Sequence, residues 1–314
     1  MSLLVFKQLC YMMVVVLISF AVAKKFKFGQ SEINFTSKIL LYLVNPCMLL
    51  NALNIPYDSQ KIKSLAFMLL LSLAIHLLMM IVACLVIRSK SEEGKLLDGI
   101  DRTGVIFTNS GFIGIPLING VLGQEGVFYL TGYLVVFNIL LWIFAPKALG
   151  CSFSIKKIVL NPNVLAVVIG FILFCLPGSL PEIVAKPVLY IGQMNTALSM
   201  ILLGMVFADF NRGKLEKRLL LRSAWTAAVR LILCPAAVLA LVIASLFLFK
   251  NTHDIKLMAI TAFIAAICPI GMSITSLAVI FKRDSSYAAF IVALTSALCI
   301  ISTPLWVYLI SLFL

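Results

Sequence analysis

The sequence predicts an all-α integral membrane protein, with ten transmembrane helices arranged as a 5+5 inverted repeat in which the fourth and ninth helices are broken. Composition excludes a soluble globular domain, because 62% of the 314 residues are hydrophobic, 12% are charged and the mean hydropathy is +1.13. Ordinary soluble domains are nearer half apolar and a quarter charged. Two further observations support the prediction: a series of apolar runs with short loops between them, and helix-breaking residues within two of those runs.

Ten apolar runs are long enough to form membrane-spanning helices, which need about 20 residues each. The first run could be a secretory signal, since the small residues Ala21-Val22-Ala23 close it, but positive charge directly afterwards favours an uncleaved span. That charge comes from Lys24, Lys25 and Lys27. The ten runs cover roughly residues 3–23, 35–53, 64–87, 103–122, 126–145, 159–177, 187–208, 222–249, 256–280 and 286–312.

The basic residues are divided unevenly between alternate loops. With the N-terminus outside, the inside loops carry roughly three times as many Lys and Arg as the outside loops, which is the bias that sets membrane orientation. We therefore predict a multi-pass protein of the cell membrane (plasma or inner), with both termini outside. The net charge of +13 then reflects topology, and no nucleic-acid partner is expected.

The ten spans divide into two sets of five. The first repeat covers residues 1–145, a cytoplasmic linker covers 146–158, and the second repeat covers 159–314. Because five is an odd number, the second set inserts upside down relative to the first, as in transporters built from inverted repeats. Aligning the spans in order matches two pairs of residues, each about 150 residues apart: Pro116 with Pro269, and Asn45 with Asn195.

The two interrupted spans give the strongest functional signal. The fourth contains Thr-Asn-Ser-Gly-Phe-Ile-Gly-Ile-Pro over residues 108–116, and the ninth contains Ala-Ile-Cys-Pro-Ile-Gly over residues 266–271. Glycine lowers the cost of leaving the helix, proline removes a backbone donor, and in lipid such a break persists only where protein shields it or where it lines a cavity. Either motif alone could be a kinked helix packed through small residues. Their pairing favours functional breaks at Gly111, Gly114, Pro116 and Pro269.

A break exposes the start of a second half-helix, whose free amides carry about half a positive charge. Two such ends facing one cavity would suit a carboxylate without a buried lysine or arginine. Asn109, just ahead of the break in the fourth span, can donate a side-chain hydrogen bond to the same anion. The predicted substrate-binding residues are Asn109, Ser110, Pro116, Pro269, Gly271 and Asn45.

Three polar positions within spans leave alternatives open. Asn45 precedes Pro46, and it either contacts the substrate or caps carbonyls that the proline frees. Arg230 is a candidate for gating or structural use, for direct anion contact, or for snorkelling toward the cytoplasmic interface near Arg222. His76 could relay protons, and the alternative is a packing residue with a satisfied ring.

Catalytic signatures are absent from the sequence, which contains no metal-binding acidic pair, His-x-x-x-His, Gly-x-Ser-x-Gly elbow or phosphate loop. We therefore expect no enzyme, no cofactor and no metal site. The eight cysteines form no Cys-x-x-Cys pair, and within apolar runs cysteine acts as a small hydrophobe. Without a nucleotide-binding domain, an ion gradient or the substrate's own gradient would have to drive transport.

Three motifs occur in the order found in a known family of carriers. They are Asn-Ser-Gly-Phe-Ile-Gly-Ile-Pro-Leu over residues 109–117, Asn45-Pro46 in the second span, and Cys268-Pro269-Ile270-Gly271 in the ninth. The chain thereby resembles the auxin efflux carrier family, which includes the plant PIN-FORMED carriers and short prokaryotic permeases. The resemblance extends along essentially the whole chain. It implies a scaffold of helices 1, 2, 6 and 7, a transport domain of helices 3–5 and 8–10, an elevator movement, and a homodimer formed through the scaffold in the lipid bilayer.

Within the transport domain, the resemblance implies that helices four and nine cross at their prolines, here Pro116 and Pro269. The family's asparagine before the crossover matches Asn109 and is implicated in holding the substrate carboxylate. The segment between spans five and six is short, unlike the long hydrophilic loop of the plant hormone carriers. Similarity to the short prokaryotic relatives therefore implies a permease for malate, malonate or similar organic anions.

The function predicted from these features is secondary transport of small organic anions. A sodium-coupled symporter of the bile-acid type is the nearest alternative, and it would need carboxylates beside the crossover, whereas no acidic residue lies near Pro116 or Pro269 in the sequence. The other alternative is a membrane sensor that binds an anion without moving it, which would be expected to carry a signalling domain.

Overall fold

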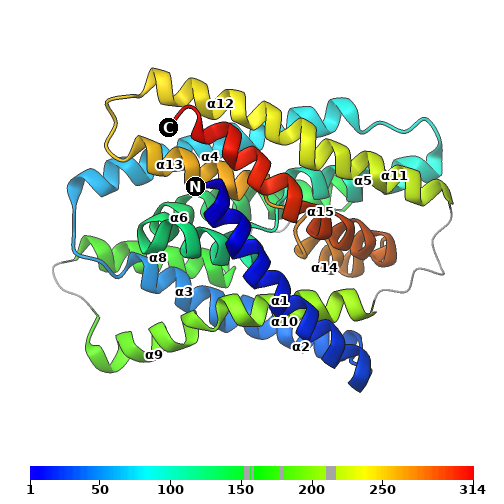
Figure 1. Cartoon of the computed structure of the whole chain (residues 1–314), viewed down its shortest axis with the longest axis horizontal. Helices are drawn as coiled ribbons and strands as arrows, with labels where there is room; N and C mark the ends of the chain where they lie inside the picture. The colour runs from blue at the N-terminus through cyan, green and yellow to red at the C-terminus, as the bar shows by residue number, and fades with distance from the viewer. Residues whose placement is uncertain (152–155, 157–158, 177–179, 210–216) are drawn as a thin grey trace.

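The chain is all-helical over the residues described by the computed structural model, as the apolar runs predict. Extended backbone pairs only at an isolated antiparallel bridge between Thr108 and Ile270 in that part of the chain. Figure 1 shows the long helices lying lengthwise beside one another. Residues 152–155 and 157–158 of the predicted linker lie outside the described ranges, which are 1–151, 156, 159–176, 180–209 and 217–314.

The first half of the chain begins with one long helix and a bent rod of three segments. Pro46 lies in the first turn of the third segment, and the π-helical turn before it accommodates the missing backbone donor. The helices are α1 (Ser2–Phe26), the bent rod of α2 (Gln30–Ile39), η1 (Leu40–Val44) and α3 (Asn45–Leu53), then α4 (Ser59–Val86), α5 (Glu92–Ile106), η2 (Ser110–Gly114) and α6 (Ile115–Ala148).

Helix α6 consists of two helical segments that meet at Gly123. This residue has φ 67° and ψ −162°, a conformation that interrupts the helix and that glycine adopts without steric cost. The boundary predicted between the fourth and fifth spans, residues 122–126, falls at the same place. Gly123 therefore marks the junction between these two predicted spans.

The second half of the chain contains the remaining helices. Among the described residues, seven helical stretches are long and apolar enough to cross a membrane, and two further apolar helices are shorter. The chain is therefore a multi-pass membrane protein. The helices are α8 (Pro162–Cys175), α9 (Glu182–Gln193), α10 (Asn195–Asp209), α11 (Lys217–Ala228), η4 (Val229–Leu233), α12 (Cys234–Leu248), α13 (Ile255–Ile267), α14 (Ser273–Ile280) and α15 (Ser285–Ser311).

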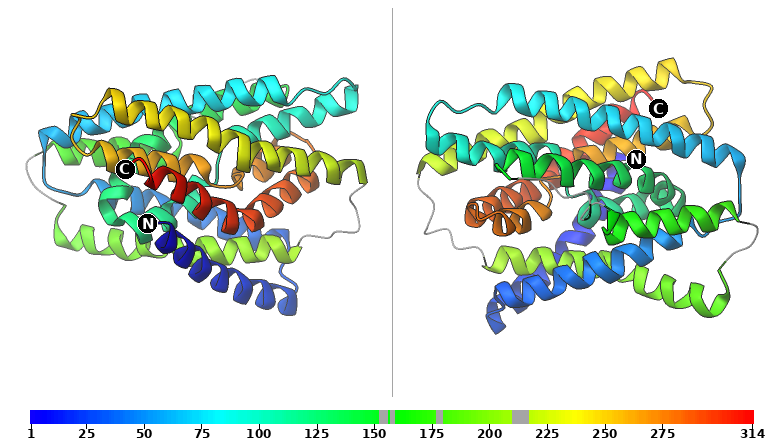
Figure 2. Two further views of the ribbon diagram at one scale, coloured as in Figure 1. Left: turned by 45° about the horizontal axis from the view of Figure 1, so that its top comes forward. Right: turned by 180° about the vertical axis from the view of Figure 1, so that it is seen from behind.

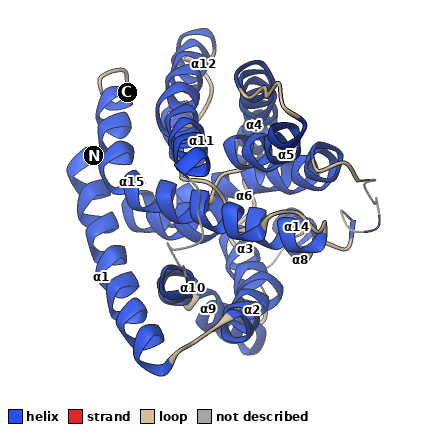
Figure 3. Ribbon diagram, turned by 90° about the vertical axis from the view of Figure 1, so that its right-hand side faces the viewer, coloured by secondary structure: helices blue, strands red, loops and turns tan. Residues whose placement is uncertain are grey.

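The helices pack in two groups. In one group, α1 packs along α10, and α3 packs against α8 and α9. In the other, α6 packs against α4 and α13, and α12 packs against the same two helices. Figure 3 shows α4, α11 and α12 on one side of the molecule and α1, α2 and α10 on the opposite side, and the views of Figure 2 agree. Helices α6 and α15 contact both groups.

Small residues allow close helix contacts, while large apolar residues face outward. A Cβ at Gly204 of α10 would lie 2.5 Å from the carbonyl oxygen of Val16 in α1, so glycine is what lets these two helices touch. Ile183, Phe247 and Leu248 are among the exposed large side chains. Such a surface suits contact with lipid rather than with water.

Candidate functional site

Two broken helices meet at their unwound segments. Helices α5 and α13 each end inside the molecule, and extended backbone follows both. The amide of Asn109 donates to the carbonyl of Pro269 at 2.7 Å, and the amide of Gly271 donates to the carbonyl of Phe107 at 3.0 Å. Each segment thus satisfies backbone groups that the other lost when its helix ended. We call this paired backbone, residues 107–109 and 268–271, the crossover.

The local sequence explains this geometry. Proline disfavours the helical conformation in the residue before it, and Cys268, which precedes Pro269, has an extended ψ of 153°. Gly271 lies so close to the opposite segment that a Cβ there would be 2.9 Å from the carbonyl oxygen of Thr108. Only glycine fits at this point without displacing the paired backbone.

A buried arginine holds the ends of both broken helices. Arg230 belongs to η4 and is 0% exposed. Its Nε and Nη2 atoms donate to the Cys268 carbonyl at 3.0 and 2.6 Å, and Nη1 donates to the Val105 carbonyl at 2.9 Å. Nη2 also donates to the carbonyl of Ala266. Because these carbonyls lie at the C-terminal ends of α5 and α13, where the helix dipole is negative, Arg230 compensates both ends at once.

These contacts bear on the alternatives for Arg230. The side chain does not snorkel to the membrane interface, because it is fully buried and bonded to the crossover. Nη1 also lies 3.4 Å from the sulfur of Met79, so all three nitrogens of the guanidinium already have protein acceptors. The geometry therefore favours a structural role over direct contact with an anion.

Unpartnered polar groups lie at the end of the first crossover segment and directly after it. Asn109 is 2% exposed and Ser110 is 0% exposed, and in the described part of the chain neither Asn109 Nδ2 nor Ser110 Oγ has a hydrogen-bond partner. Buried polar atoms are nearly always paired, so these two are candidates for contact with a ligand. In the first turn of η2, which begins at Ser110, the Ile113 amide donates to the Asn109 carbonyl at 2.8 Å, whereas the amides before it start the helix and have no acceptor within it.

A pair of asparagines lies beside η2, in the other group of helices. Asn195 Nδ2 donates to Asn45 Oδ1 at 2.6 Å, and the two residues begin α10 and α3 respectively. Asn45 Nδ2 lies 3.9 Å from the place of a Cβ on Gly111 in η2. Asn195 Oδ1 and Ser199 Oγ are buried without partners among the residues described. Both sides of this contact therefore present polar atoms that are free to bond.

The contact beside η2 is otherwise apolar and close-packed. A cavity of 20 Å³ lies between α1, η2, α10 and α15, which is about the volume that one water molecule needs. Its polar wall is Ser296, whose buried hydroxyl has no partner in the described ranges. The thioether side chains that line it belong to Met12, Met13 and Met200.

Three of the predicted break residues, Gly111, Gly114 and Pro116, lie after the crossover. Pro116 is in the first turn of α6, whereas the backbone pairing occurs at Thr108. The implied crossing at Pro116 is therefore wrong, and the reason is that proline is tolerated at the start of a helix, where its missing amide has no acceptor anyway. Gly114 lies nearer, because a Cβ there would be 3.3 Å from Cys268 Sγ. Its small size lets the two broken helices touch.

His76 lies in α4, on the side of α6 and η4. Its ring is 0% exposed and lies among the rings of Tyr133, Phe107 and Phe137, with centroid distances of 4.9, 6.2 and 6.0 Å. The ring Nδ1 is 2.8 Å from the carbonyl oxygen of Ser72. The His76 ring is therefore enclosed by the Phe107 ring and by aromatic side chains of α6.

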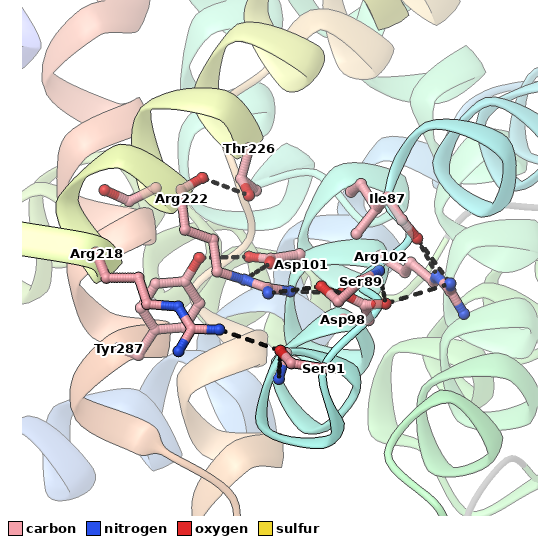
Figure 4. A network of polar contacts seen from close by, with 12 residues as sticks. Ile87, Ser89, Ser91, Asp98, Asp101, Arg102, Arg218, Arg222, Thr226 and Tyr287 are labelled. Carbon is pink, nitrogen blue, oxygen red and sulfur yellow. Dashed lines mark hydrogen bonds and ion pairs between the residues drawn. The ribbon is translucent and has the colours of Figure 1, made fainter.

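A charged network joins three helices at the start of the first broken helix (Figure 4). Arg222 of α11 donates to Asp98 through Nη2 and to Asp101 through Nε, both at 2.6 Å. Tyr287 of α15 donates to Asp101 at 2.7 Å, and Ser89 of the α4–α5 loop donates to Asp98 at 2.6 Å. The network fixes α5 against α11 and α15.

The charge state of Asp98 follows from these contacts. Asp98 precedes the predicted fourth span, and its side chain is 5% exposed. Burial disfavours the charged carboxylate, but hydrogen bonds from Ser89 and from the Arg222 guanidinium outweigh burial and hold the pKa of Asp98 below its ordinary value. The carboxylate is therefore expected to be ionised at neutral pH.

Sequence reasoning missed this network and one residue of the crossover. The spacing of Asp98 and Asp101, three residues apart and so on one helical face, was the available signal for the network. Thr295 of α15 accepts a hydrogen bond from the amide of Ile270 at 3.2 Å and so completes the pairing of the crossover. No sequence pattern distinguishes this threonine from others within apolar helices.

Comparison with known proteins identifies the family. A family model described as a membrane transport protein matches residues 4–147 and 148–307 of the chain. The chain belongs to this family, that of the auxin efflux carriers. The resemblance stated from the three motifs is confirmed, and membership makes the chain a membrane transporter. A search of curated proteins found no match to the chain.

In this member of the auxin efflux carrier family, the crossover brings together groups that attract negative charge. The crossover presents half-helix amides and the Asn109 side chain, while Arg230 compensates the opposite, negative helix ends. Such an arrangement can hold a small anion by hydrogen bonds and dipoles alone.

Proposed function

We propose that the chain is a secondary transporter of small organic anions, such as malate- or malonate-like carboxylates. The observation that carries the proposal is the unpartnered Asn109 Nδ2 beside the paired backbone of two broken helices. A buried amide donor with no acceptor of its own is costly unless a ligand supplies one. The substrate carboxylate would be that acceptor.

The electrostatics of the two half-helices support an anion. The starts of η2–α6 and of α14 each contribute about half a positive charge, so the pair contributes roughly one. Arg230 compensates the C-terminal ends of α5 and α13, so the negative ends of these helices do not cancel that attraction. Ser110 Oγ can share the carboxylate with Asn109.

The proposed movement is an elevator. The group formed by α4, α6 and α12–α13 would be the transport domain, and the group formed by α1, α3 and α8–α10 would be the scaffold, since each packs mainly within itself. We also propose the ten-helix inverted repeat, a homodimer and outside termini. The repeat is supported by Asn45 and Asn195, which begin the second segments of two matching bent helices.

The test is uptake of radiolabelled malate, malonate and an indole acid by proteoliposomes, with the proton and sodium gradients varied separately. Saturable uptake of a carboxylate would support the proposal. Strict dependence on sodium would instead favour the symporter of the bile-acid type. Binding of these anions without flux would favour a sensor.

Variants of Asn109 test whether this residue contributes to binding of the transported carboxylate. Asn109→Ala should raise the KM for the carboxylate, and Asn109→Asp should raise it further because it places a negative charge beside the anion. Asn138→Ala is the matched control, since Asn138 is also buried but already donates to the Leu134 carbonyl at 2.7 Å, away from the crossover. An unchanged KM in both Asn109 variants would refute the assignment.

A further inference from the structure

The crossover has a second polar face. Asn109 precedes η2, which packs on α10, whereas the hydroxyl of Thr108 interacts with the hydroxyl of Tyr133 in α6. Neither of these hydroxyls makes a hydrogen bond of good geometry to any described residue.

The ring of His76 completes this second face. Its Nδ1 must carry a proton, because the Ser72 carbonyl oxygen at 2.8 Å can only accept. In the neutral ring Nε2 is then unprotonated and carries a lone pair that can accept a hydrogen bond. This atom has no hydrogen-bond partner among the described residues. The Tyr133 ring lies 4.9 Å from the His76 ring. Three elements thus contribute buried polar atoms that make no hydrogen bond of good geometry among the described residues: His76 Nε2, Tyr133 Oη and Thr108 Oγ1.

The charges around His76 restrict what it can bind. Arg230 and Tyr133 are the titratable groups that interact with it, Cys234 and Cys268 adjoin Arg230, and α5 contributes the Phe107 ring. No acidic side chain appears among these neighbours. A positive ring in such surroundings needs a compensating negative charge. The carboxylate held on the other face of the same backbone would bring that charge.

We propose that His76 takes up a proton at Nε2 when an anion occupies the crossover, so that one proton travels with each anion. This inference rests on the proposed function. The proton comes from water on one side of the membrane and adds to the Nε2 lone pair. On the other side of the membrane the anion leaves and the proton returns to water. A monovalent carboxylate and its proton then cross with no net charge, and a fully ionised dicarboxylate such as malonate crosses with one net negative charge.

The test is the pH dependence of malonate uptake by proteoliposomes, between about pH 5 and 8 where histidine usually titrates. Because binding of anion and proton is reciprocal, the wild-type KM should fall by up to about tenfold for each unit of decrease in pH. His76→Gln should remove that dependence. His253→Gln is the matched control, because His253 is the second histidine of the chain and lies on an exposed loop beside Asp254.

Comparison between variants isolates the ring of His76. The ionisation of malonate itself affects all three proteins equally, so the difference between His76→Gln and His253→Gln reports the buried histidine. A pH-sensitive dye inside the vesicles should record proton entry with malonate in the wild type and in His253→Gln, and none in His76→Gln.

A second variant covers the case in which His76→Gln fails to fold. Tyr133→Phe keeps the ring and removes the hydroxyl, so the fall in KM should persist but require a lower pH. Malonate flux with the same pH dependence in wild type, His76→Gln and Tyr133→Phe would overturn this inference and leave the proposed function standing. Absence of saturable flux for the whole carboxylate panel would overturn both.

Discussion

Gly271 and Thr108 meet so closely that a Cβ on the glycine would lie 2.9 Å from the threonine carbonyl oxygen. The same glycine donates its amide to the Phe107 carbonyl at 3.0 Å. Backbone contact at this distance leaves no space for a side chain between the two broken helices. The position of Asn109 relative to α14 therefore depends on a single residue without a Cβ.

Gly271→Ala should lower stability by about 1–3 kcal/mol, the usual cost of forcing a methyl group into packed structure. Gly111→Ala is the matched control within the partner segment, because a Cβ there meets nothing nearer than Asn45 Nδ2 at 3.9 Å. Thermal unfolding in detergent measures both. Equal shifts of Tm for the two variants would show that the close approach has no energetic consequence.

Arg230→Lys should destabilise the protein nearly as much as Arg230→Gln. Lysine keeps the positive charge but lacks the planar guanidinium with which arginine reaches carbonyls on two helices at once. Each buried carbonyl that is left unpaired costs about 1–3 kcal/mol. Arg283→Lys is the control, since Arg283 is only part-buried and donates to the single carbonyl of Leu149. Full retention of Tm in Arg230→Lys would mean that charge alone matters.

The Asn45–Asn195 hydrogen bond can be measured by a double-mutant cycle. Each single alanine variant should destabilise the protein, and the double variant should cost less than their sum by about 0.5–1.5 kcal/mol, the net worth of a buried hydrogen bond. Urea unfolding in a mild detergent gives the three values. Strict additivity would argue that the two side chains are not coupled.

The contribution of Asp98 should depend on pH. Its pKa is lower in the folded protein than its ordinary value of about 3.9, so its stabilisation is complete above that value and is lost as the pH falls through the folded pKa. Asp98→Asn should therefore lower Tm at pH 7, and the difference from the wild type should shrink in acid. A difference independent of pH would indicate that the ion pair with Arg222 does not act through charge.

Much of the fold could be predicted because the signals are local. A run of about 20 apolar residues predicts a membrane-spanning helix without any knowledge of tertiary contacts. Gly123 likewise lies at the junction predicted between two spans. The breaks after Ile106 and Ile267 are also local, since glycine and proline act on the backbone beside them.

The register of the crossing and the role of Arg230 could not be read from the chain. Pro116 suggested the wrong crossing point because a proline marks the first turn after a break as readily as the break itself. Arg230 was ambiguous because its acceptors are backbone carbonyls of Val105 and Cys268, and a carbonyl has no sequence signature. Only tertiary contacts distinguish a capping arginine from one near the membrane surface.

In the proposed elevator movement, the methionines that line the small cavity between α1, η2, α10 and α15 would affect how these helices slide past one another. Methionine is unbranched and has three rotatable bonds, so Met12, Met13 and Met200 can refill irregular gaps at little cost as the opposing surface moves. Val16 and Ile113, in the same lining, are β-branched and stiffer. In the proposed movement, the resistance of this surface to sliding would depend on side-chain flexibility rather than on the number of contacts.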